Sequence, residues 1–472
     1  MSTQCSGSEE QREFSFGKHF RREVTARFDG GKISSDGGGV LLGEVDRRLG
    51  LLDRLAGCFE DRRDPERIEH RVAELVKQRV YAIALGYEDL NDHDQLRNDP
   101  LLALLAGKSD LEGENRKRRR DRGQAMAGKS TLNRLERSTD GEDRYNKISC
   151  EFERIDELLL ATFLEAHEQA PKQLILDLDA TDSPLHGEQE GRFFHGYYGH
   201  YCYLPLYIFA GPHLLCARQR TSNQDAAAGS VAEVERIVAG LRAQWPRVRI
   251  IVRADSGFCR EELLSWCEGN NVKYVIGLAR NQRLRALIDK EMRTASERQA
   301  ETGKAAREIA ELRYQTLNSW SRERRVVAKA EQLEGKENPR YVVTSLSKQA
   351  YSAQKLYEQL YCARGEMENR IKEQLSLFSD RMSAQTMRAN QLRLYFSSLA
   401  YTLMLGLRRL GLAGTAWAQA QTETIRRRVL KIGVRVKVTA RRVWLSLAEG
   451  WPGRELFAAV WRALRESPPL PA

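Results

Sequence analysis

Two short apolar segments that each end in aspartate constrain the fold of this chain most strongly. They are QLILDLD at Gln173–Asp179 and VRIIVRAD at Val248–Asp255. Both have the length and the apolar character of buried β-strands. Between them, Ala226–Gln244 repeats apolar residues at helical spacing, which predicts a helix. Strands that alternate with helices predict a mixed α/β sheet.

Further strands are expected around this pair. Gly191–Gly211 alternates aromatic with small residues and predicts one or two strands, and His213–Arg220 continues that pattern. A helix is expected from about Arg260, followed by a strand at Lys273–Leu278. We assign residues 166–280 to the first part of an α/β core.

Residues 1–165 predict mainly helices joined by polar loops. Asp64–Gly86 and Ser149–Glu168 both place apolar residues at helical spacing, and Pro65 lies near the start of the first, where proline is tolerated. Between them, Glu114–Arg122 has the sequence ENRKRRRDR. This run is too charged for a core, so it forms either a solvated loop or an arm that contacts phosphates.

The alternation of strand and helix breaks after about Asn281. Residues 281–349 combine a charged, partly helical stretch, Arg283–Leu312, with three expected short strands, at Leu312–Leu317, Arg324–Lys329 and Tyr341–Leu346. We interpret this part as a β-rich insertion.

Two long helices, at about Ser352–Leu375 and Ala384–Leu407, are expected next, so residues 350–410 form a helical second part of the core. Residues 411–472 form a basic C-terminal tail region. Within it, Ile425–Trp444 is strongly basic and alternates like a strand around Val434–Val438.

The bulk composition narrows the class of protein. Lysine and arginine number 76 against 65 acidic residues, a net charge of +11, which indicates a polyanionic partner or an ordinary basic surface. The sequence has no run of 18 apolar residues, so no membrane span is predicted, and the first residues lack the features of a signal peptide. The eight cysteines form no C-x-x-C pair, which favours reduced thiols in a cytoplasm.

One motif is rejected. Gly123–Ser130, GQAMAGKS, matches the phosphate-loop pattern of nucleotide-binding proteins. That loop must follow a buried strand, whereas the eight residues before Gly123 are NRKRRRDR. We interpret the segment as a polar loop in which Ser130 caps a helix before Leu132. No nucleotide is therefore expected as a partner.

The aspartates that end the two strands suggest metal chemistry. Asp177 and Asp179 share one face of their strand, and Asp255 is followed by the turn residues Ser256–Gly257. Carboxylate oxygens are the ligands that Mg²⁺ prefers, and a pair of metal ions can clamp the attacking and leaving oxygens of a phosphodiester. The alternative is that these aspartates only cap loops.

A third carboxylate would come from a helix. Tyr361, Arg364, Glu368 and Lys372 fall on one face of Ser352–Leu375. Glu366 lies about 200° round the helix from Glu368, so one site cannot easily use both. The alternative for Arg364, Glu368 and Lys372 is a ladder of ion pairs on a solvated helix.

Three blocks of this sequence closely resemble the DDE transposases of insertion-sequence family 1380, within the broad insertion-sequence 4 group. They are LDLDATDSPLHGEQEGRFFHGYYGHYCYLPLYIFAG, RADSGFCREELLSWC and YCARGEMENRIKEQ, and the resemblance covers most of residues 15–410. It implies an RNase H-like catalytic core, dependence on Mg²⁺ or Mn²⁺ with two ions, and cut-and-paste chemistry on DNA. Asp179 matches the D-x-T pattern, Asp255 matches ADSGF, and Glu368 matches Y-x₂-R-x₃-E.

One position departs from the broader group pattern, which has a lysine seven residues after the glutamate. This chain has Leu375 there, and Lys372 lies on the same helix face as Glu368. The group also carries a β-rich insertion before the glutamate, and residues 281–349 agree with that.

The resemblance, together with the positive charge of the basic runs, gives each candidate an expected role. Asp179, Asp255 and Glu368 would bind metal and carry the catalysis. The DNA contacts would be Tyr361, Arg364, Lys372, Arg118, Arg119, Arg120, Arg426, Arg427 and Arg428. The helical N-terminal region would recognise terminal inverted repeats, and a homo-oligomer would hold double-stranded transposon ends and target DNA at a bacterial nucleoid. A plain nuclease with the same core, and a DNA-binding protein that has lost its chemistry, remain as alternatives.

Overall fold

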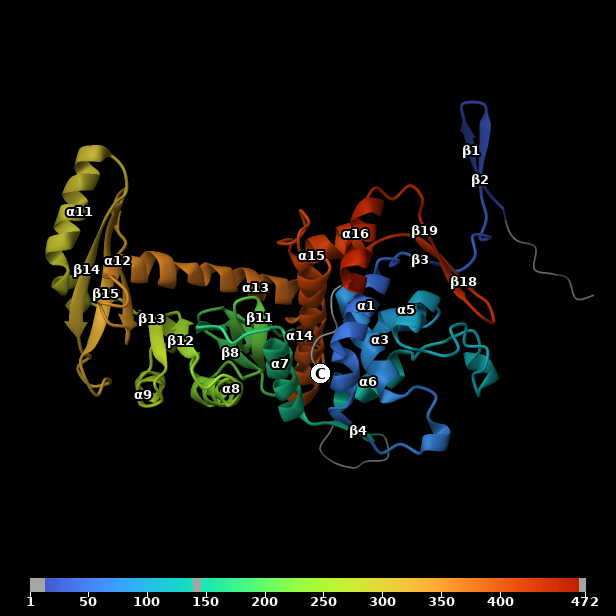
Figure 1. Cartoon of the computed structure of the whole chain (residues 1–472), viewed down its shortest axis with the longest axis horizontal. Coiled ribbons are helices and arrows are strands. Elements are labelled where there is room, and N and C mark those ends of the chain that lie inside the picture. The colour runs from blue at the N-terminus through green and yellow to red at the C-terminus, as the bar shows by residue number, and fades with distance from the viewer. Residues whose placement is uncertain (1–12, 139–145, 467–472) are drawn as a thin grey trace, which may run out of the picture.

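A nine-stranded mixed sheet organises the computed structural model, which describes residues 13–138 and 146–466. Strands β6 (Gln173–Ala180), β12 (Arg249–Ala254) and β13 (Lys273–Leu278) run parallel at its centre. The antiparallel strands β10 (Leu206–Ala210) and β11 (His213–Arg218) extend the sheet beyond β6. The predicted mixed α/β sheet is confirmed (Figure 1).

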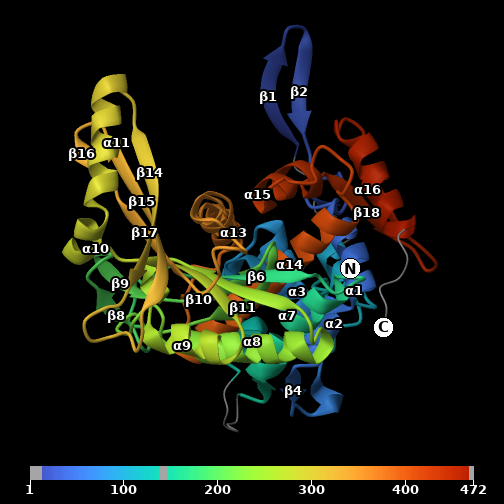
Figure 2. The same cartoon turned by 60° about the vertical axis from the view of Figure 1, so that its left-hand side comes forward.

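The strands expected in a β-rich insertion belong to the same sheet. β17 (Arg340–Thr344) pairs with β13, and β15 (Arg324–Leu333) pairs with β17. The outermost strands are β14 (Ala306–Tyr314) and the short β16 (Lys336–Glu337). Helices α10 (Gln282–Leu287) and α11 (Asp289–Thr302) precede them. This end of the sheet rises above its centre, with α11 beside β14 (Figure 2).

The strand expected at Leu312–Leu317 is wrong in its bounds, because β14 ends at Tyr314. The hydroxyl of Thr316 accepts hydrogen bonds from the backbone amides of Ser319 and Trp320, and this side-chain bonding forms a turn. Leu317 therefore lies exposed in that turn.

Two layers of helix cover the central strands. Helices α8 (Ser230–Gln244) and α9 (Glu261–Gly269) pack on one face, against side chains such as Leu176, Leu178 and Val252. The other face carries the helical segment of residues 353–376. This segment comprises α12 (Ala353–Lys355), the π-helical η5 (Leu356–Tyr361), the 3₁₀ turn η6 (Cys362–Arg364) and α13 (Gly365–Ser376). The sequence predicts one long regular helix here, and the wide turn at η5 is the difference.

The N-terminal half packs around α14 (Met387–Leu410), whose side chains are almost all buried. Thr386 caps this helix by accepting from the amide of Ala389. Neighbouring helices are α1 (Gly39–Leu49), α2 (Leu51–Ala56), α3 (Val72–Leu85), α5 (Pro100–Leu105), α6 (Lys129–Arg137) and α7 (Phe152–Glu165). Smaller elements here are β1 (Phe14–His19), β2 (Arg22–Ala26), β3 (Ile33–Ser34), β4 (Phe59–Asp61), η1 (Pro65–Arg67), η2 (Leu90–Asp92), α4 (His93–Leu96), η3 (Arg119–Asp121) and β5 (Ile148–Cys150).

The C-terminal segment packs back onto the N-terminal half. It contains α15 (Thr422–Ile425), η7 (Arg426–Leu430), β18 (Val434–Val438), β19 (Val443–Leu447) and α16 (Arg454–Glu466). β18 pairs with β3, and Val460 and Leu464 of α16 are buried where that helix meets α1. None of the helices that the structure describes combines the length and apolar character needed to cross a membrane.

Helix α6 corrects one detail of the rejected phosphate-loop match. It begins at Lys129 with Gly128 as its N-cap, so Ser130 lies inside the first turn rather than capping it. The segment before Gly123 forms only the 3₁₀ turn η3, and no strand leads directly into the loop. In a phosphate loop a preceding strand orients the backbone amides toward the phosphates. Gly123–Ser130 matches the sequence motif but lacks this structure.

Candidate active site

The candidate site lies on one face of the paired strands β6 and β12. Their register sets Asp177 beside Arg253 and Leu178 beside Ala254. Because side chains alternate along a strand, Ile175, Asp177 and Asp179 face away from helices α8 and α9. Ile251, Arg253 and Asp255 follow the same alternation on β12. Along this face, apolar side chains come first, the buried pair of Asp177 and Arg253 follows, and the carboxylates of Asp179 and Asp255 lie at the carboxyl ends of the strands.

The buried ion pair lies beneath those carboxylates. Arg253 Nε donates to Asp177 Oδ1 at 2.5 Å, and Arg253 Nη2 donates to Asp177 Oδ2 at 2.8 Å. The remaining nitrogen, Nη1, donates to the carbonyl of Leu360 at 2.6 Å. Leu360 belongs to the π-helical turn η5, so the pair ties this turn to the sheet just before Tyr361 and Arg364. Asp177 is thereby committed to a structural role.

Asp179 and Glu368 meet through an arginine. Arg364 Nη1 donates to Asp179 Oδ2 at 3.0 Å, and Arg364 Nη2 donates to Glu368 Oε1 at 3.3 Å. Asp179 is mostly buried, with 15% of its side chain exposed, whereas the Glu368 side chain is 55% exposed. Helix α13 thus carries Glu368 across the end of β6, on the face that holds Asp179.

Asp255 caps the turn that follows β12. Its Oδ1 accepts from the amide of Gly257 at 2.8 Å. Burial raises the pKa of Asp179 to about 6, the positive charge of Arg364 opposes that rise, and the negative charge of Asp255 adds to it. The two aspartates therefore interact electrostatically, as neighbours at the ends of adjacent parallel strands must.

Tyr361 packs beside the same cluster. A Cβ placed on Gly277 would lie 2.6 Å from the Tyr361 hydroxyl and 2.9 Å from the amide of Ser256. Glycine is required at position 277 because the tyrosine passes this close to the end of β13. The sequence predicts a DNA contact at Tyr361, and the structure places it half-buried next to Asp255, where only part of it is accessible.

The remaining helix candidates differ in exposure. Lys372 is exposed one turn beyond Glu368 on α13, and Glu366 is exposed without an ion pair to any described residue. Leu375 packs against the core of the N-terminal half. The apolar residue at the position where the broader group has lysine therefore serves the docking of α13 onto that core.

The basic candidates outside the helix fall into two groups. Arg118, Arg119 and Arg120 are exposed in the loop around η3, and Arg427 and Arg428 are exposed in η7. Arg426 is only 6% exposed. It donates to the carbonyls of Ala84 and Ser376 and to the carboxylate of Glu423. The expected DNA contact at Arg426 is therefore wrong, because its guanidinium holds three segments of the fold together.

The carboxylates can be compared with the needs of a divalent metal ion. Asp179, Asp255 and Glu368 offer only oxygen donors, the type that Mg²⁺ and Mn²⁺ accept. Among the described residues no three acidic, histidine or cysteine side chains already converge as a ligand set. Arg364 lies between two of the three and supplies positive charge there. The donor set fits a hard cation once this arginine moves aside.

Sequence reasoning missed Arg253 and Gly277. Arg253 interrupts an otherwise apolar strand, and a lone charge in a buried strand requires a partner. That signal pointed to an ion pair close to the aspartates. The requirement for Gly277 has no such signal, because it arises only where Tyr361 crosses a strand 84 positions earlier in the sequence.

The fold places carboxylates at the edge of a mixed α/β sheet, and comparison with known protein families gives the class of this chain. Residues 16–469 match the family model described as transposase DDE domain group 1. The chain belongs to this family, so it is a DDE transposase, an enzyme of DNA transposition.

One solved structure similar to this chain is described as a cryo-EM structure of the piggyBac transposase synaptic complex with hairpin DNA. The two chains are 9% identical, the match covers 92% of this chain and 83% of that chain, and the TM-score is 0.40. No curated protein matches this chain significantly.

Proposed function

We propose that this transposase carries out metal-dependent cut-and-paste transposition as a member of insertion-sequence family 1380, with an RNase H-like core. The observation that carries the proposal is the placement of three carboxylates on one face of the sheet. Asp179 and Asp255 end adjacent parallel strands, and Arg364 links Glu368 to Asp179.

In this proposal Asp179, Asp255 and Glu368 hold Mg²⁺ or Mn²⁺, with two ions at the reacting phosphodiester. Bound metal would activate water and stabilise charge on the attacking and leaving oxygens. The raised pKa of Asp179 fits this role, because it indicates that Arg364 does not fully offset the burial of this carboxylate. The freed 3′-OH of the transposon end would then attack a target phosphodiester at the same carboxylates, forming a new P–O bond while the target strand leaves as its own 3′-OH.

Arg364 and Tyr361 position the reacting strand. When metal occupies the carboxylates, the guanidinium of Arg364 is free to turn toward a phosphate, for which its planar fork is suited. Lys372 lies exposed further along α13 and provides charge beside the same strand. The domain boundaries expected at residues 165, 280, 349 and 410 remain part of the proposal, with the N-terminal region recognising the terminal inverted repeats.

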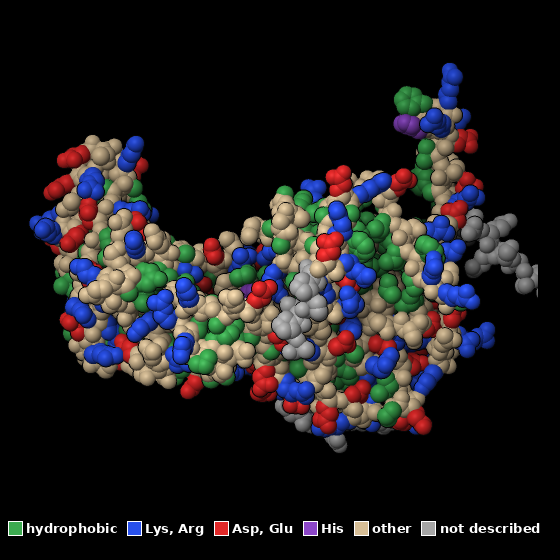
Figure 3. Space-filling model, in the orientation of Figure 1, with side chains coloured by type: hydrophobic (Ala, Val, Ile, Leu, Met, Phe, Trp, Pro, Cys, Tyr) green, Lys and Arg blue, Asp and Glu red, His purple; other side chains and the backbone are tan. Residues whose placement is uncertain are grey.

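The shape of the molecule supports a DNA-binding surface along α13. This helix runs along the upper side of the molecule between the α11–β14 end and the half that carries α15 and α16 (Figure 1). The space-filling surface dips between these two ends (Figure 3). Glu368 and Lys372 are exposed on α13 in this stretch. A duplex lying in the dip would cross α13, the helix that carries Glu368 and Lys372, and a second copy of the chain would hold the other transposon end.

The decisive test compares wild-type protein with Asp255→Ala on labelled DNA that carries the element's own terminal repeat, with Mg²⁺ present. Wild type should cut the end and join its 3′-OH to a target duplex, whereas the variant should bind the end without cutting it. Joining separates a transposase from a plain nuclease, which would cut only. Wild-type cleavage by the variant would contradict the carboxylate assignment, and complete loss of binding would assign Asp255 a structural role.

A further inference from the structure

A basic cavity in the N-terminal half has no role in the carboxylate chemistry. Its volume is about 640 Å³, and it lies where the loop around η3 meets the first turn of α6. Nine lysine or arginine side chains line it, against three acidic side chains. Such an excess of one sign in a cavity favours an anionic occupant.

The acidic side chains do not neutralise this excess. Each already faces a cation of the same cavity: Glu69 faces Arg116 at 3.1 Å, Asp94 faces Lys129 at 3.2 Å and Asp121 faces Arg120 at 3.8 Å. Arg97, Arg118 and Arg134 form no ion pair with any residue in the described ranges. They come from three segments of the chain, and only the charge of Arg97 is partly offset, by that of Asp94.

His70, on the cavity wall, is crowded by cations. Its Nδ1 lies 3.4 Å from Lys108 Nζ, and its Nε2 lies 2.5 Å from Arg116 Nη1. Burial, followed by the charges of Lys108, Arg116 and Arg63, lowers the pKa of His70 to about 3. A neutral imidazole has one acceptor nitrogen, so one of its two cationic neighbours faces a ring N–H. Lys108 also donates to the carboxylate of Glu74 and the carbonyl of Glu69, whereas the buried Arg116 Nε has no hydrogen-bond partner among the described residues.

The start of α6 adds backbone polarity of the same sign. The first-turn residues Lys129, Ser130 and Thr131 line the cavity, and no side chain of the N-cap residue caps the helix. A Cβ on Gly128 would lie 3.1 Å from Asp94 Oδ1 and 3.2 Å from Arg97 Nη1, so the absence of a side chain lets both groups approach the helix start. Helix N-termini attract anions; here the carboxylate of Asp94 already accepts from the first amide, that of Lys129, at 3.2 Å, so one of the donors available to an anion is occupied.

We propose that this cavity binds backbone phosphates of the DNA that the transposase processes, anchoring the duplex away from the carboxylates. The inference rests on the proposed function and locates one phosphate-binding site within the N-terminal region that the proposed function already assigns to DNA. The resemblance of Gly123–Ser130 to a phosphate loop makes a free nucleotide the other source of phosphate. DNA is favoured because Arg119 and Arg122, which do not line the cavity, continue the exposed positive charge along the loop.

The first test removes the charge without removing an ion pair. The triple variant Arg97→Gln, Arg118→Gln, Arg134→Gln should weaken binding of terminal-repeat and scrambled duplexes alike, by several-fold or more. Counterion release predicts that the slope of log affinity against log salt flattens by about 0.9 for each phosphate that the variant no longer neutralises, so by up to about 2.7 for three. Fluorescence polarisation with full-length protein measures both quantities.

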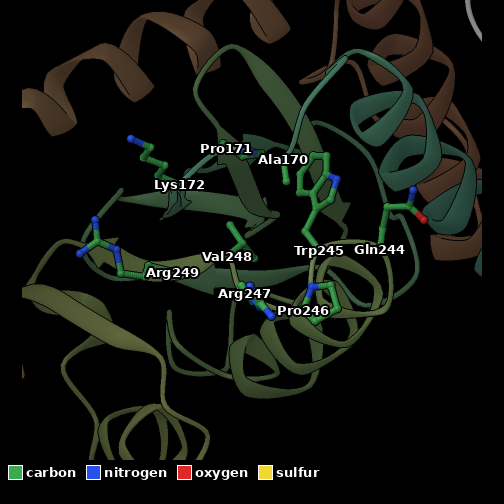
Figure 4. A pocket seen from close by; sticks show the side chains of 9 residues that line it. All are labelled: Ala170, Pro171, Lys172, Gln244, Trp245, Pro246, Arg247, Val248 and Arg249. Carbon is green, nitrogen blue, oxygen red and sulfur yellow. The ribbon is translucent and has the colours of Figure 1, made fainter.

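A matched control removes three cations elsewhere. Lys172, Arg247 and Arg249 lie around a pocket at the amino-terminal ends of β6 and β12, opposite the carboxylates (Figure 4). Their replacement by glutamine changes net charge equally and should leave the salt slope close to wild type. Equal flattening by the two triple variants would show only an effect of net charge and would overturn the assignment of the cavity.

A second variant guards against misfolding. Ser130→Asp adds a negative charge in the first turn of α6, where an acidic side chain stabilises a helix. It should therefore lower DNA affinity while leaving the unfolding temperature unchanged or raised. Unchanged affinity and slope in both Ser130→Asp and the arginine triple variant would overturn the proposal.

The outcomes separate this proposal from the proposed function. If wild type cuts and joins DNA while both cavity variants bind like wild type, only the cavity assignment fails. If wild type binds no DNA, both fail. Binding of ATP or inorganic triphosphate that the triple variant loses, together with unchanged DNA affinity in that variant, would overturn the assignment to DNA in favour of a free nucleotide.

Discussion

Arg364 and Asp179 are joined by an ion pair at the edge of the central sheet, with Arg364 Nη1 donating to Asp179 Oδ2 at 3.0 Å. The same guanidinium reaches Glu368, so the arginine lies between two of the three carboxylates assigned to metal. A cation at this place lowers the repulsion between them and competes with a divalent ion. The pair therefore links the charge state of the site to the position of Arg364.

We expect Arg364→Met to bind Mn²⁺ more tightly than wild type in the absence of DNA. A hydrogen bond between charged groups is worth about 1.5–3 kcal/mol, and about 1.4 kcal/mol is tenfold in affinity, so the gain should be about tenfold or more. Isothermal titration calorimetry measures it. Arg370→Met, on the same helix and paired with Glu373, is the control and should bind like wild type. Weaker Mn²⁺ binding by Arg364→Met would contradict the competition.

Glu368→Gln should reduce cleavage of the transposon end by at least about a hundredfold, because stabilisation of charge by metal is worth several kcal/mol. The matched control is Glu366→Gln, an exposed glutamate two residues earlier that pairs with no described cation. Single-turnover cleavage with Mg²⁺ measures both variants. Equal reductions in the two would mean that the helix needs its acidic charge in general rather than Glu368 in particular.

Asp179→Asn should raise the stability of the metal-free protein at neutral pH. The pKa of this carboxyl is raised from 3.8 to about 6 in the folded chain, chiefly by burial, so the folded state binds more protons than the unfolded state between these values. Stability is therefore lost as pH rises from about 4 to 6. Removing the charge should recover up to about 3 kcal/mol above pH 6 and nothing below pH 4.

Denaturant unfolding of wild type and Asp179→Asn at several pH values checks this dependence. The difference between them should grow with pH across the stated window and then remain constant. A difference independent of pH would assign the effect of the substitution to packing.

Asp177→Ala should destabilise the fold by about 3–5 kcal/mol, because it leaves the buried guanidinium of Arg253 without its partner. The double variant Asp177→Leu, Arg253→Met removes both charges and should be less destabilised than the single variant. Urea unfolding gives both values. If Asp177→Ala instead folds with wild-type stability and loses only cleavage, Asp177 belongs to the catalytic carboxylates.

Arg427 and Arg428 are exposed whereas Arg426 is buried, so substitutions should affect DNA binding in the first case and stability in the second. Replacing the two exposed arginines by glutamine should weaken binding to all duplexes and flatten the salt slope by about 0.9 for each phosphate that they neutralise. Arg426→Gln should lower the unfolding temperature, since this side chain holds the carbonyls of Ala84 and Ser376. An unchanged salt slope for the double variant would show that these two residues face solvent only.

The sequence by itself determined the elements and the residues of interest near the sheet. Apolar runs that end in Asp179 and Asp255 predicted β6 and the end of β12, because buried strands need continuous apolar side chains. Helical spacing placed Arg364 and Glu368 on one face of a helix. These properties depend on neighbours within a few positions, which is why they could be predicted.

Only the tertiary structure decided which of these side chains contact one another and which serve to stabilise the fold. Asp177 and Asp179 are equivalent in the strand pattern. Arg253 forms an ion pair with Asp177, whereas Asp179 lies at the open edge beside Arg364. Arg426 stands in a basic run that predicts a surface, and the packing of η7 against α3 buries it. Contacts between residues distant in sequence depend on the packing of whole elements, and local periodicity does not contain that information.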